Sequence, residues 1–210
     1  MKTALVACEC SGVVRDALIA VGIDAVSCDI KDTEKDGPHY KGDVRNILNY
    51  NWDLLIAHPV CRYLANSGVR WLHEHQGRWE KMVAGASFFK MFINATHIKH
   101  RAIENPKMHT YAMDIIGDKP TQYIQPWWFG DPYQKETGWW IYNLPKLVAT
   151  HKKTDYSEIK QACWLEPPGP ERETNRSRTY PCHAKAIAEQ WGGYLLNGKI
   201  ISNLQMSLFG

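Results

Sequence analysis

The architecture follows from residues 3–28, TALVACECSGVVRDALIAVGIDAVSC. Residues 3–7 are a short apolar run typical of a buried strand, and the polar residues 8–12 that follow indicate a tight loop. Residues 13–21 carry apolar side chains at helical spacing, Gly22 ends that helix, and residues 23–28 form a second apolar run closed by Asp29. A strand, a helix and a strand in direct succession predict parallel strands joined by a crossover.

The rest of the chain continues this alternation. It predicts a strand at 54–57, a helix at 77–98, a strand at 102–103, an extended aromatic segment at 123–128, a turn at 129–132, a returning strand at 137–141 and a helix at 184–191 that Gly192 and Gly193 end. Residues 150–179 are polar and indicate an exposed connection. We therefore expect an open, doubly wound α/β sheet that binds ligands at the carboxyl ends of its strands.

Composition indicates a soluble chain with one main domain, over residues 1–210. The 210 residues are 44% hydrophobic and 22% charged, as in ordinary globular proteins. No apolar run approaches the roughly 18 residues of a membrane span, and residues 1–7 lack a secretory cleavage pattern, so we expect a cytoplasmic protein without a membrane partner. The net charge of +3 fits a nucleic-acid partner and many small-molecule enzymes alike.

The six cysteines are expected to be reduced thiols, because the chain has no regular disulfide spacing. Cys28 and Cys163 fit a core or neutral position. Close pairs such as Cys8 with Cys10 and His73 with His75 lack a second pair at a zinc-module spacing, so no metal site is expected.

Two strand ends carry residues suited to a nucleoside. The loop at 8–12 has the position of a nucleotide-binding turn, where the amides of a helix N-terminus approach a polar ligand, although an ordinary turn has the same pattern. Asp29 ends the second strand, where a carboxylate commonly accepts hydrogen bonds from ribose hydroxyls, and Asp43 follows the next loop. Together they indicate a nucleoside-containing cofactor.

A cysteine and a glutamate follow two further strands. Cys61 ends the segment His58-Pro59-Val60-Cys61, where Arg62 and His58 are candidates to favour its thiolate; its alternative is a small buried core residue. Glu104, in Ile103-Glu104-Asn105-Pro106, is a candidate proton donor if burial raises its pKa, and a turn cap otherwise.

In this order, these segments resemble the cytosine-5 DNA methyltransferase family, in particular its short methylase-like members from phages and prophages. The resemblance implies a Rossmann-like S-adenosylmethionine-dependent methyltransferase fold, with a mixed, mostly parallel sheet and helices on both faces. The implied cofactor-binding residues are Cys10, Ser11, Gly12, Asp29, Ile30, Asp43, Val44, His58 and Pro59. The implied catalytic residues are Cys61, Glu104 and Lys135, and the implied substrate-binding residues are Arg62, Asn105, Thr137, Arg176 and Arg178.

The resemblance also implies the reaction. In this family a thiolate, here Cys61, adds to carbon 6 of cytosine, because carbon 5 is too weak a nucleophile to accept a methyl group directly. Glu104 would protonate ring nitrogen 3 while Lys135 supports the base. The cofactor is S-adenosyl-L-methionine and the partner is DNA, whose cytosine must leave the stack of a duplex. A phage role such as protection from restriction follows from the family alone.

The chain departs from the family pattern in several places. Its cofactor loop lacks the usual aromatic and glycine-rich sequence, Val60 stands where a second proline is expected, and Lys135 stands for arginine, which loses a planar fork of donors. The region that normally reads bases is reduced to residues 138–177, about 40 residues. We therefore expect relaxed sequence recognition, recognition by a partner, or a single-stranded or free-nucleotide substrate.

Aromatic and basic residues in this reduced segment allow two interpretations. Trp139 and Trp140, with Lys152, Lys153 and Arg172, are candidates to stack bases and hold a backbone, and equally fit core tryptophans beside a solvated loop. Three functions stay open: methylation of cytosine in DNA, the same chemistry on a nucleotide or RNA, and a non-catalytic module that kept the cofactor pocket.

Overall fold

The computed structural model describes residues 1–151, 157–161, 165–169 and 172–198, which form a seven-stranded sheet with the order β3-β2-β1-β4-β5-β7-β6. The strands are β1 (Thr3–Ala7), β2 (Asp24–Asp29), β3 (His39–Lys41), β4 (Leu54–Ala57), β5 (His100–Pro106), β6 (Gln122–Ile124) and β7 (Thr137–Tyr142). β1 to β5 pair in parallel, whereas β7 runs antiparallel to both β5 and β6. The predicted returning strand is therefore confirmed.

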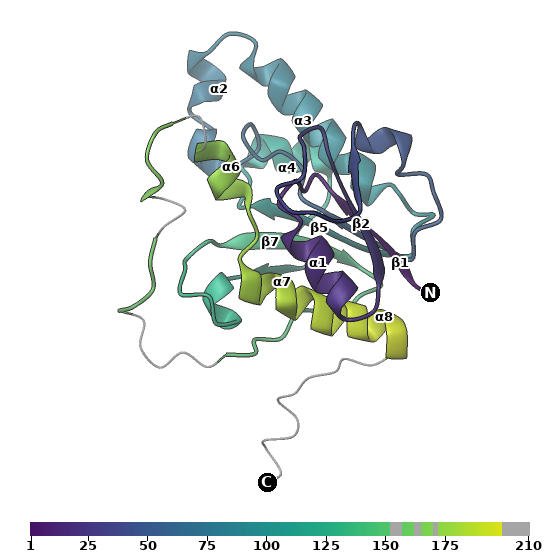
Figure 1. Cartoon of the computed structure of the whole chain (residues 1–210). Coiled ribbons are helices and arrows are strands. Elements are labelled where there is room, and N and C mark those ends of the chain that lie inside the picture. Colours follow the sequence, from purple (N-terminus) through teal and green to yellow (C-terminus); the bar gives the residue numbers. More distant parts are fainter. Residues whose placement is uncertain (152–156, 162–164, 170–171, 199–210) are drawn as a thin grey trace.

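Helices cover both faces of this sheet (Figure 1). They are α1 (Val13–Ala20), α2 (Trp71–Glu74), α3 (Arg78–Ile93), α4 (Thr110–Ile116), α6 (Arg172–Ser177), α7 (Pro181–Ile187) and α8 (Gly193–Asn197). α1 and α7 pack on one face, and α3 and α4 pack on the other. The fold is α/β and Rossmann-like, mixed and mostly parallel, as predicted.

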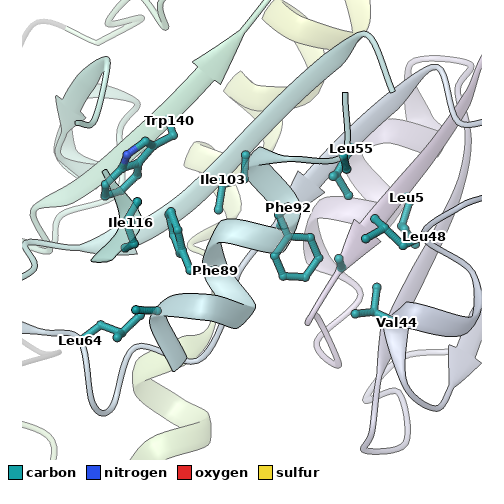
Figure 2. Packing of buried hydrophobic residues seen from close by; sticks show 14 of the residues in the cluster. Leu5, Val44, Leu48, Leu55, Leu64, Phe89, Phe92, Ile103, Ile116 and Trp140 are labelled. Carbon is teal, nitrogen blue, oxygen red and sulfur yellow. The ribbon is translucent and has the colours of Figure 1, made fainter. Parts of the chain in front are cut away.

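The alternation of side chains along the strands explains why both faces are covered. Leu5 of β1 points into the cluster with Phe89 and Phe92 of α3, as Figure 2 shows. Val6, the next residue, points into the cluster with Leu18 of α1 on the opposite face. Full burial of each phenylalanine contributes about 2–3 kcal/mol relative to exposure, so α3 is firmly attached to the sheet.

The C-terminal helix does not end at Gly192 and Gly193, so that prediction is wrong. The chain passes from α7 through a π-helical turn, Ala188–Gly192, into α8, and Gly198 with φ +68° ends it. A Cβ atom on Gly192 would lie 3.0 Å from Cγ2 of Val21. The glycine therefore lets the C-terminal helices pack closely against the end of α1.

Two other segments differ from their predictions. Pro126–Trp128 is a 3₁₀ turn rather than extended chain, because the proline at its first position suits a helical start. The connection at 150–179 contains α6, while Lys152, Lys153 and Cys163 lie outside the described residues. Among the described helices, none has the length and apolar character needed to cross a bilayer.

Candidate functional site

The predicted site residues gather at one edge of the sheet because they follow neighbouring parallel strands. Ala57 of β4 pairs with Ala7 of β1 on one side and with Ile103 of β5 on the other, and Ala7 pairs with Cys28 of β2. The next residues along these strands therefore lie side by side at the carboxyl edge. Four segments meet there: 8–12, 29–30, 58–61 and 104–105.

Cys61 lies in the loop after β4, partly buried and with a free thiol. Burial and the negative charge of Glu104 raise its pKa to about 11, while the positive charges of Lys135 and Arg176 act in the opposite direction. The structure thus brings the three predicted catalytic side chains within electrostatic reach of one another.

The cations that act on the thiol are Lys135 and Arg176, in place of the predicted Arg62 and His58. Arg62 is exposed, and its guanidinium lies 5.8 Å from the centre of the Tyr63 ring. His58 has a different partner, since its Nδ1 lies 3.1 Å from Oε2 of Glu104.

The pKa of Glu104 is lowered, so the condition set for a proton donor, a pKa raised by burial, is not met in the free chain. The carboxylate is only 9% exposed, and this burial does raise its pKa. However, the hydrogen bond from His58, with the positive charge of Lys135, outweighs the burial. His58 was not predicted as this partner, because it fitted a cofactor-binding position and because the pairing joins side chains that follow or lie in different strands.

Both members of this pair and the neighbouring His183 keep a buried polar atom without a hydrogen-bond partner. These atoms are Glu104 Oε1, His58 Nε2 and His183 Nε2. The Trp139 ring contacts both imidazoles, with centroids 5.8 Å from His58 and 5.9 Å from His183. An unsatisfied buried polar group costs about 1–3 kcal/mol, so the cluster offers unused donors and acceptors to a polar ligand.

His183, which the sequence did not single out, sits on α7 stacked against Phe129 at 5.1 Å. Burial lowers its pKa to about 3, which keeps the imidazole neutral at physiological pH. Its backbone N–H donates to Asp131 Oδ2 at 2.9 Å, which fixes the start of the helix. The proline at residue 181 is a sequence signal for this helix start. No signal in the sequence indicates which side chains surround His183.

Three predicted catalytic or substrate residues make internal contacts. Lys135 Nζ donates to the carbonyl of Arg178 at 3.2 Å, and the Thr137 hydroxyl donates to the carbonyl of Lys135 at 3.1 Å. Asn105 Nδ2 donates to the carbonyl of Pro59 at 3.1 Å. Asn105 and Thr137 are both buried, so they hold the loops of the site together rather than face a substrate.

Arg178, predicted to contact the substrate, is bound to Glu34 in the loop after β2. Its Nε and Nη2 donate to the two carboxylate oxygens at 2.8 and 2.9 Å. Nearby, Lys31 Nζ donates to the hydroxyl of Thr174 in α6 at 3.0 Å. These contacts join the C-terminal segment to the loop that follows Asp29, and Glu34 was not predicted.

The loop at 8–12 differs from the predicted ligand-binding turn. The first amides of α1 are already bound, because Glu9 accepts from Val14 N at 2.7 Å and from Arg15 N at 3.3 Å. Ser11 donates to the same carboxylate at 3.1 Å. The amides of Val14 and Arg15 are therefore satisfied within the chain, and the sequence signal for this was a carboxylate placed just before a helix start.

Gly12 begins α1 with φ +70°, and a Cβ atom there would lie 2.5 Å from the guanidinium of Arg15. That buried guanidinium donates to Thr33, Lys35 and Asp36. The carbonyl of Cys10, which is partly buried, accepts from the Glu34 amide at 2.8 Å. These contacts hold the loop after β2 against the loop after β1.

Asp29 and Asp43 differ in how many of their carboxylate oxygens already accept a hydrogen bond. Asp29 Oδ1 accepts from Lys31 N at 2.9 Å, and its Oδ2 accepts nothing from the described residues. Both oxygens of Asp43 are bound by Arg45, whose contacts lower the pKa of the carboxyl. Ile30 is 76% exposed, whereas Val44 is buried. Asp29 and Ile30 thus offer a free carboxylate oxygen beside an exposed apolar side chain.

Metal chemistry has no evident ligand set. Among the described residues, no three His, Cys, Asp or Glu side chains gather as a metal ion requires. The five described cysteines are Cys8, Cys10, Cys28, Cys61 and Cys182, all free thiols, and Cys28 is buried as expected.

Solved structures with a similar arrangement are methyltransferases by their descriptions. One is described as a DNA modification methyltransferase encoded within an E. coli prophage, with 10% identity, a TM-score of 0.42, and coverage of 67% of this chain and 46% of that chain. Entamoeba histolytica methyltransferase EhMeth has 16% identity, a TM-score of 0.43, and coverage of 81% and 62%. A triple mutant of Spodoptera frugiperda DNMT2 has 14% identity, a TM-score of 0.37, and coverage of 75% and 57%.

The chain thus spans between 46% and 62% of the length of these structures. No family model matches it, and the comparison with curated proteins finds no match. The assignment of the fold rests on the strand order and pairing of the sheet itself.

Proposed function

We propose that the chain is an S-adenosylmethionine-dependent methyltransferase that modifies carbon 5 of cytosine in DNA through a covalent adduct with Cys61. The observation that carries the proposal is the convergence of three groups at the carboxyl edge of β4 and β5. The charges of Glu104 and Lys135 both act on the Cys61 thiol, and Glu104 keeps one buried oxygen without a partner. A nucleophile, a proton carrier and a cation are the groups that this reaction requires.

Asp29 and Ile30 fit the cofactor. A carboxylate oxygen that accepts nothing suits a ribose hydroxyl, and an exposed apolar side chain beside it suits an adenine ring. S-adenosyl-L-methionine would supply the methyl group as a sulfonium. Asp43 and Val44 would shape the same pocket from the following turn, while the bonds between Asp43 and Arg45 would have to open before that carboxylate could read a base.

The chain's own residues would divide the chemistry as follows. Cys61, once deprotonated, adds to carbon 6 of the base, and Lys135 supports the negative charge that develops on the ring. Glu104 offers its unpartnered Oε1 to ring nitrogen 3. Because its pKa is lowered, Glu104 holds no proton at neutral pH before a base binds, so it would have to take up a proton in the complex to donate to ring nitrogen 3.

DNA is the proposed partner, with a single methyltransferase domain over residues 1–210 and a reduced recognition segment at about 138–177. Arg176 supports a substrate role, since its charge reaches the thiol. Trp139 and Trp140 do not, because both are buried in the core with at most 1% exposure. A target in a duplex would have to flip into the site. We place this activity in the cytoplasm of a bacterial or phage-infected cell, where it would protect DNA from restriction.

Transfer of label tests the proposal. The chain is incubated with methyl-labelled S-adenosylmethionine and, in parallel, duplex DNA, single-stranded DNA, RNA or dCMP, and the products are hydrolysed to nucleosides. We expect label on carbon 5 of cytosine from DNA, and its loss in Cys61→Ser. Cys182→Ser, which changes a thiol outside the proposed chemistry, is the matched control. Label that persists in Cys61→Ser rules out thiolate chemistry, and label on RNA or dCMP alone redirects the same chemistry to those substrates.

A second function, cofactor binding without turnover, is favoured by one observation, the Cys61 pKa above its ordinary range, which leaves little thiolate at neutral pH. A DNA strand containing 5-fluorocytosine, given together with S-adenosylmethionine, separates the two functions. After attack by Cys61 and methyl transfer to carbon 5, fluorine stands where a proton must leave, so the thiolate cannot be released and the strand stays covalently bound. Cofactor bound without such an adduct supports the second function.

A further inference from the structure

Aromatic rings and arginines occur together on the segment that follows Cys61. This segment folds into a 3₁₀ turn, Asn66–Gly68, then α2 and the first turn of α3. We call six residues the aromatic–arginine surface: Tyr63, Arg70, Trp71, Arg78, Trp79 and Tyr111. Their ring and cation contacts form three pairs, Arg70 with Trp71, Arg78 with Tyr63, and Trp79 with Tyr111. The Arg78 guanidinium and the Trp71 ring both lie beside Gly68, since a Cβ atom on this glycine would contact both. The first two pairs are therefore neighbours.

Two of the rings present area to solvent. Trp79 and Tyr111 pack edge to face, with centroids 5.0 Å apart and an interplanar angle of 67°. Trp79 is 37% exposed and Tyr111 is 40% exposed. Large aromatic side chains gain by burial, so exposed rings in contact with each other mark a surface suited to stacking with a ligand.

The arginines of the surface have rings rather than carboxylates as neighbours. The Arg70 guanidinium lies 4.2 Å from the Trp71 ring centre, and that of Arg78 lies 5.1 Å from the Tyr63 ring centre. Within the described part of the chain, no carboxylate forms an ion pair with Arg70 or Arg78. A guanidinium stacked on a ring keeps its charge and its N–H donors, which match a phosphate.

Hydrogen bonds attach this surface to both loops of the candidate site. The Ala65 amide donates to the carbonyl of Cys61 at 2.9 Å, and the Asn66 amide donates to the carbonyl of Lys107 at 2.9 Å. Lys107 directly follows the end of β5, the strand that carries Glu104. The segment that carries the surface is therefore attached to the loop that carries the nucleophile and to the end of β5.

We propose that the aromatic–arginine surface binds a single strand of nucleic acid next to the target base. Bases stack on Trp79 and Tyr111, and phosphates meet Arg70 and Arg78. The occupant is a single strand rather than a duplex because the bases of a duplex already stack on one another, whereas unpaired bases offer their faces to exposed rings. The inference rests on the proposed function for the identity of the target and deepens it by naming the form of the substrate.

Binding measurements test the inference separately from catalysis. Fluorescence anisotropy compares a labelled DNA strand of about 16 nucleotides with its duplex, using the full chain. We expect tighter binding of the single strand. Replacing both Trp79 and Tyr111 by alanine should weaken that binding about tenfold. Arg70→Gln should weaken it and reduce the slope of log affinity against log salt by about 0.7.

Matched variants outside the surface control these effects. Tyr50→Ala removes a ring that is 60% exposed, and Lys119→Ala removes an exposed cation; neither should change affinity. Equal affinity for duplex and single strand overturns the inference. Affinity for the single strand that is unchanged in the surface variants overturns it as well, and so does a surface that binds a protein but no nucleic acid. The double aromatic variant is checked for folding by circular dichroism. Because Arg70 is exposed, Arg70→Gln should fold normally and tests the inference even if the double variant does not fold.

The inference and the proposed function fail in different ways. Cys61→Ser should abolish methyl transfer and leave strand binding intact. If the wild-type chain binds the strand through the surface but transfers no methyl group to any substrate, only the proposed function fails. If it methylates DNA with a KM that the surface variants leave unchanged, only the inference fails.

Discussion

At neutral pH the Cys61 thiol carries its proton, because burial and the charge of Glu104 raise its pKa to about 11. Only the thiolate attacks carbon or sulfur centres. Lys135 and Arg176 act in the opposite direction, so the surroundings of this one sulfur set how much nucleophile is present. A base seated between Cys61 and Glu104 would separate their charges and favour the thiolate in the complex.

Alkylation of Cys61 by iodoacetamide, followed by peptide mass spectrometry, measures this balance without substrate. The rate should rise about tenfold for each pH unit from neutral pH towards the pKa. Glu104→Gln removes a negative charge and should lower the Cys61 pKa, which speeds alkylation at pH 8 about threefold or more. Lys135→Met should slow it by a similar factor.

Opposite signs make this pair of variants informative. A general loosening of the fold would speed alkylation in both variants, whereas the electrostatic account requires one to be faster and the other slower. Alkylation of Cys10, whose pKa is raised mainly by burial and by Asp29, serves as the internal control and should not change. Equal rates for Cys61 in all three proteins would contradict the account.

The meeting of Cys61 and Glu104 was predictable because Cys61 follows β4 and Glu104 lies near the carboxyl end of the adjacent parallel strand β5. Their hydrogen-bond partners were not. His58 and Glu104 are 46 residues apart, and Arg178 and Glu34 are 144 residues apart. Which polar side chains meet across a cleft depends on loop paths and rotamers, and neither leaves a periodic signal in the sequence.

The N-terminus of α1 is stabilised by a carboxylate of the chain itself. Glu9 is 6% exposed and accepts from two helix amides and from Ser11. Its negative charge also lies at the positive end of the helix dipole. A carboxylate here supports the position of the loop at 8–12 without any ligand.

Replacing Glu9 by alanine should lower the free energy of unfolding by about 1–3 kcal/mol, because buried amides lose their acceptor. Urea denaturation followed by circular dichroism measures the change. Glu80→Ala is the control, since Glu80 is an exposed acid in the first turn of α3, and it should cost less than about 0.5 kcal/mol. Similar losses in both variants would show that Glu9 has no more than a surface role.

Elements with strong apolar periodicity were predictable, and short polar ones were not. β1, α1 and β2 lie within one or two residues of their predicted bounds. β3 was missed because it has three partly exposed residues at the edge of the sheet. Gly192 was predicted to end a helix, but it allows close packing against Val21 instead. The sequence alone does not distinguish these two roles of a glycine.

Across the whole molecule, elements from the N-terminal and C-terminal parts of the described chain pack together. α7 packs on α1. Arg178 lies a few residues before α7 in the chain, and it donates hydrogen bonds to Glu34 on the loop after β2. Lys135 in turn donates to the carbonyl of Arg178. The loop after β2 and Lys135 thus share one connected set of contacts through Arg178, so the segment that leads into α7 contributes to the stability of the candidate site.

His183, on α7, makes global stability sensitive to acid. Burial lowers its pKa from 6.5 to about 3 in the folded chain, so only the unfolded chain takes up this proton between those values. Its contribution to stability is therefore complete above pH 6.5 and is lost as the pH falls towards 3. Glu104, whose pKa is also lowered, loses its contribution only as the pH falls below its ordinary value of 4.5.

The window between pH 6.5 and 4.5 therefore isolates the histidine. The free energy of unfolding of the wild-type chain should fall there with a slope of up to about 1.4 kcal/mol per pH unit. His183→Gln cannot take up this proton and should show a flatter profile, whatever its stability at neutral pH. Urea denaturation at a series of pH values gives both slopes. The same slope in both proteins would assign the proton uptake to other groups and would remove the argument for a neutral, buried imidazole beside Glu104.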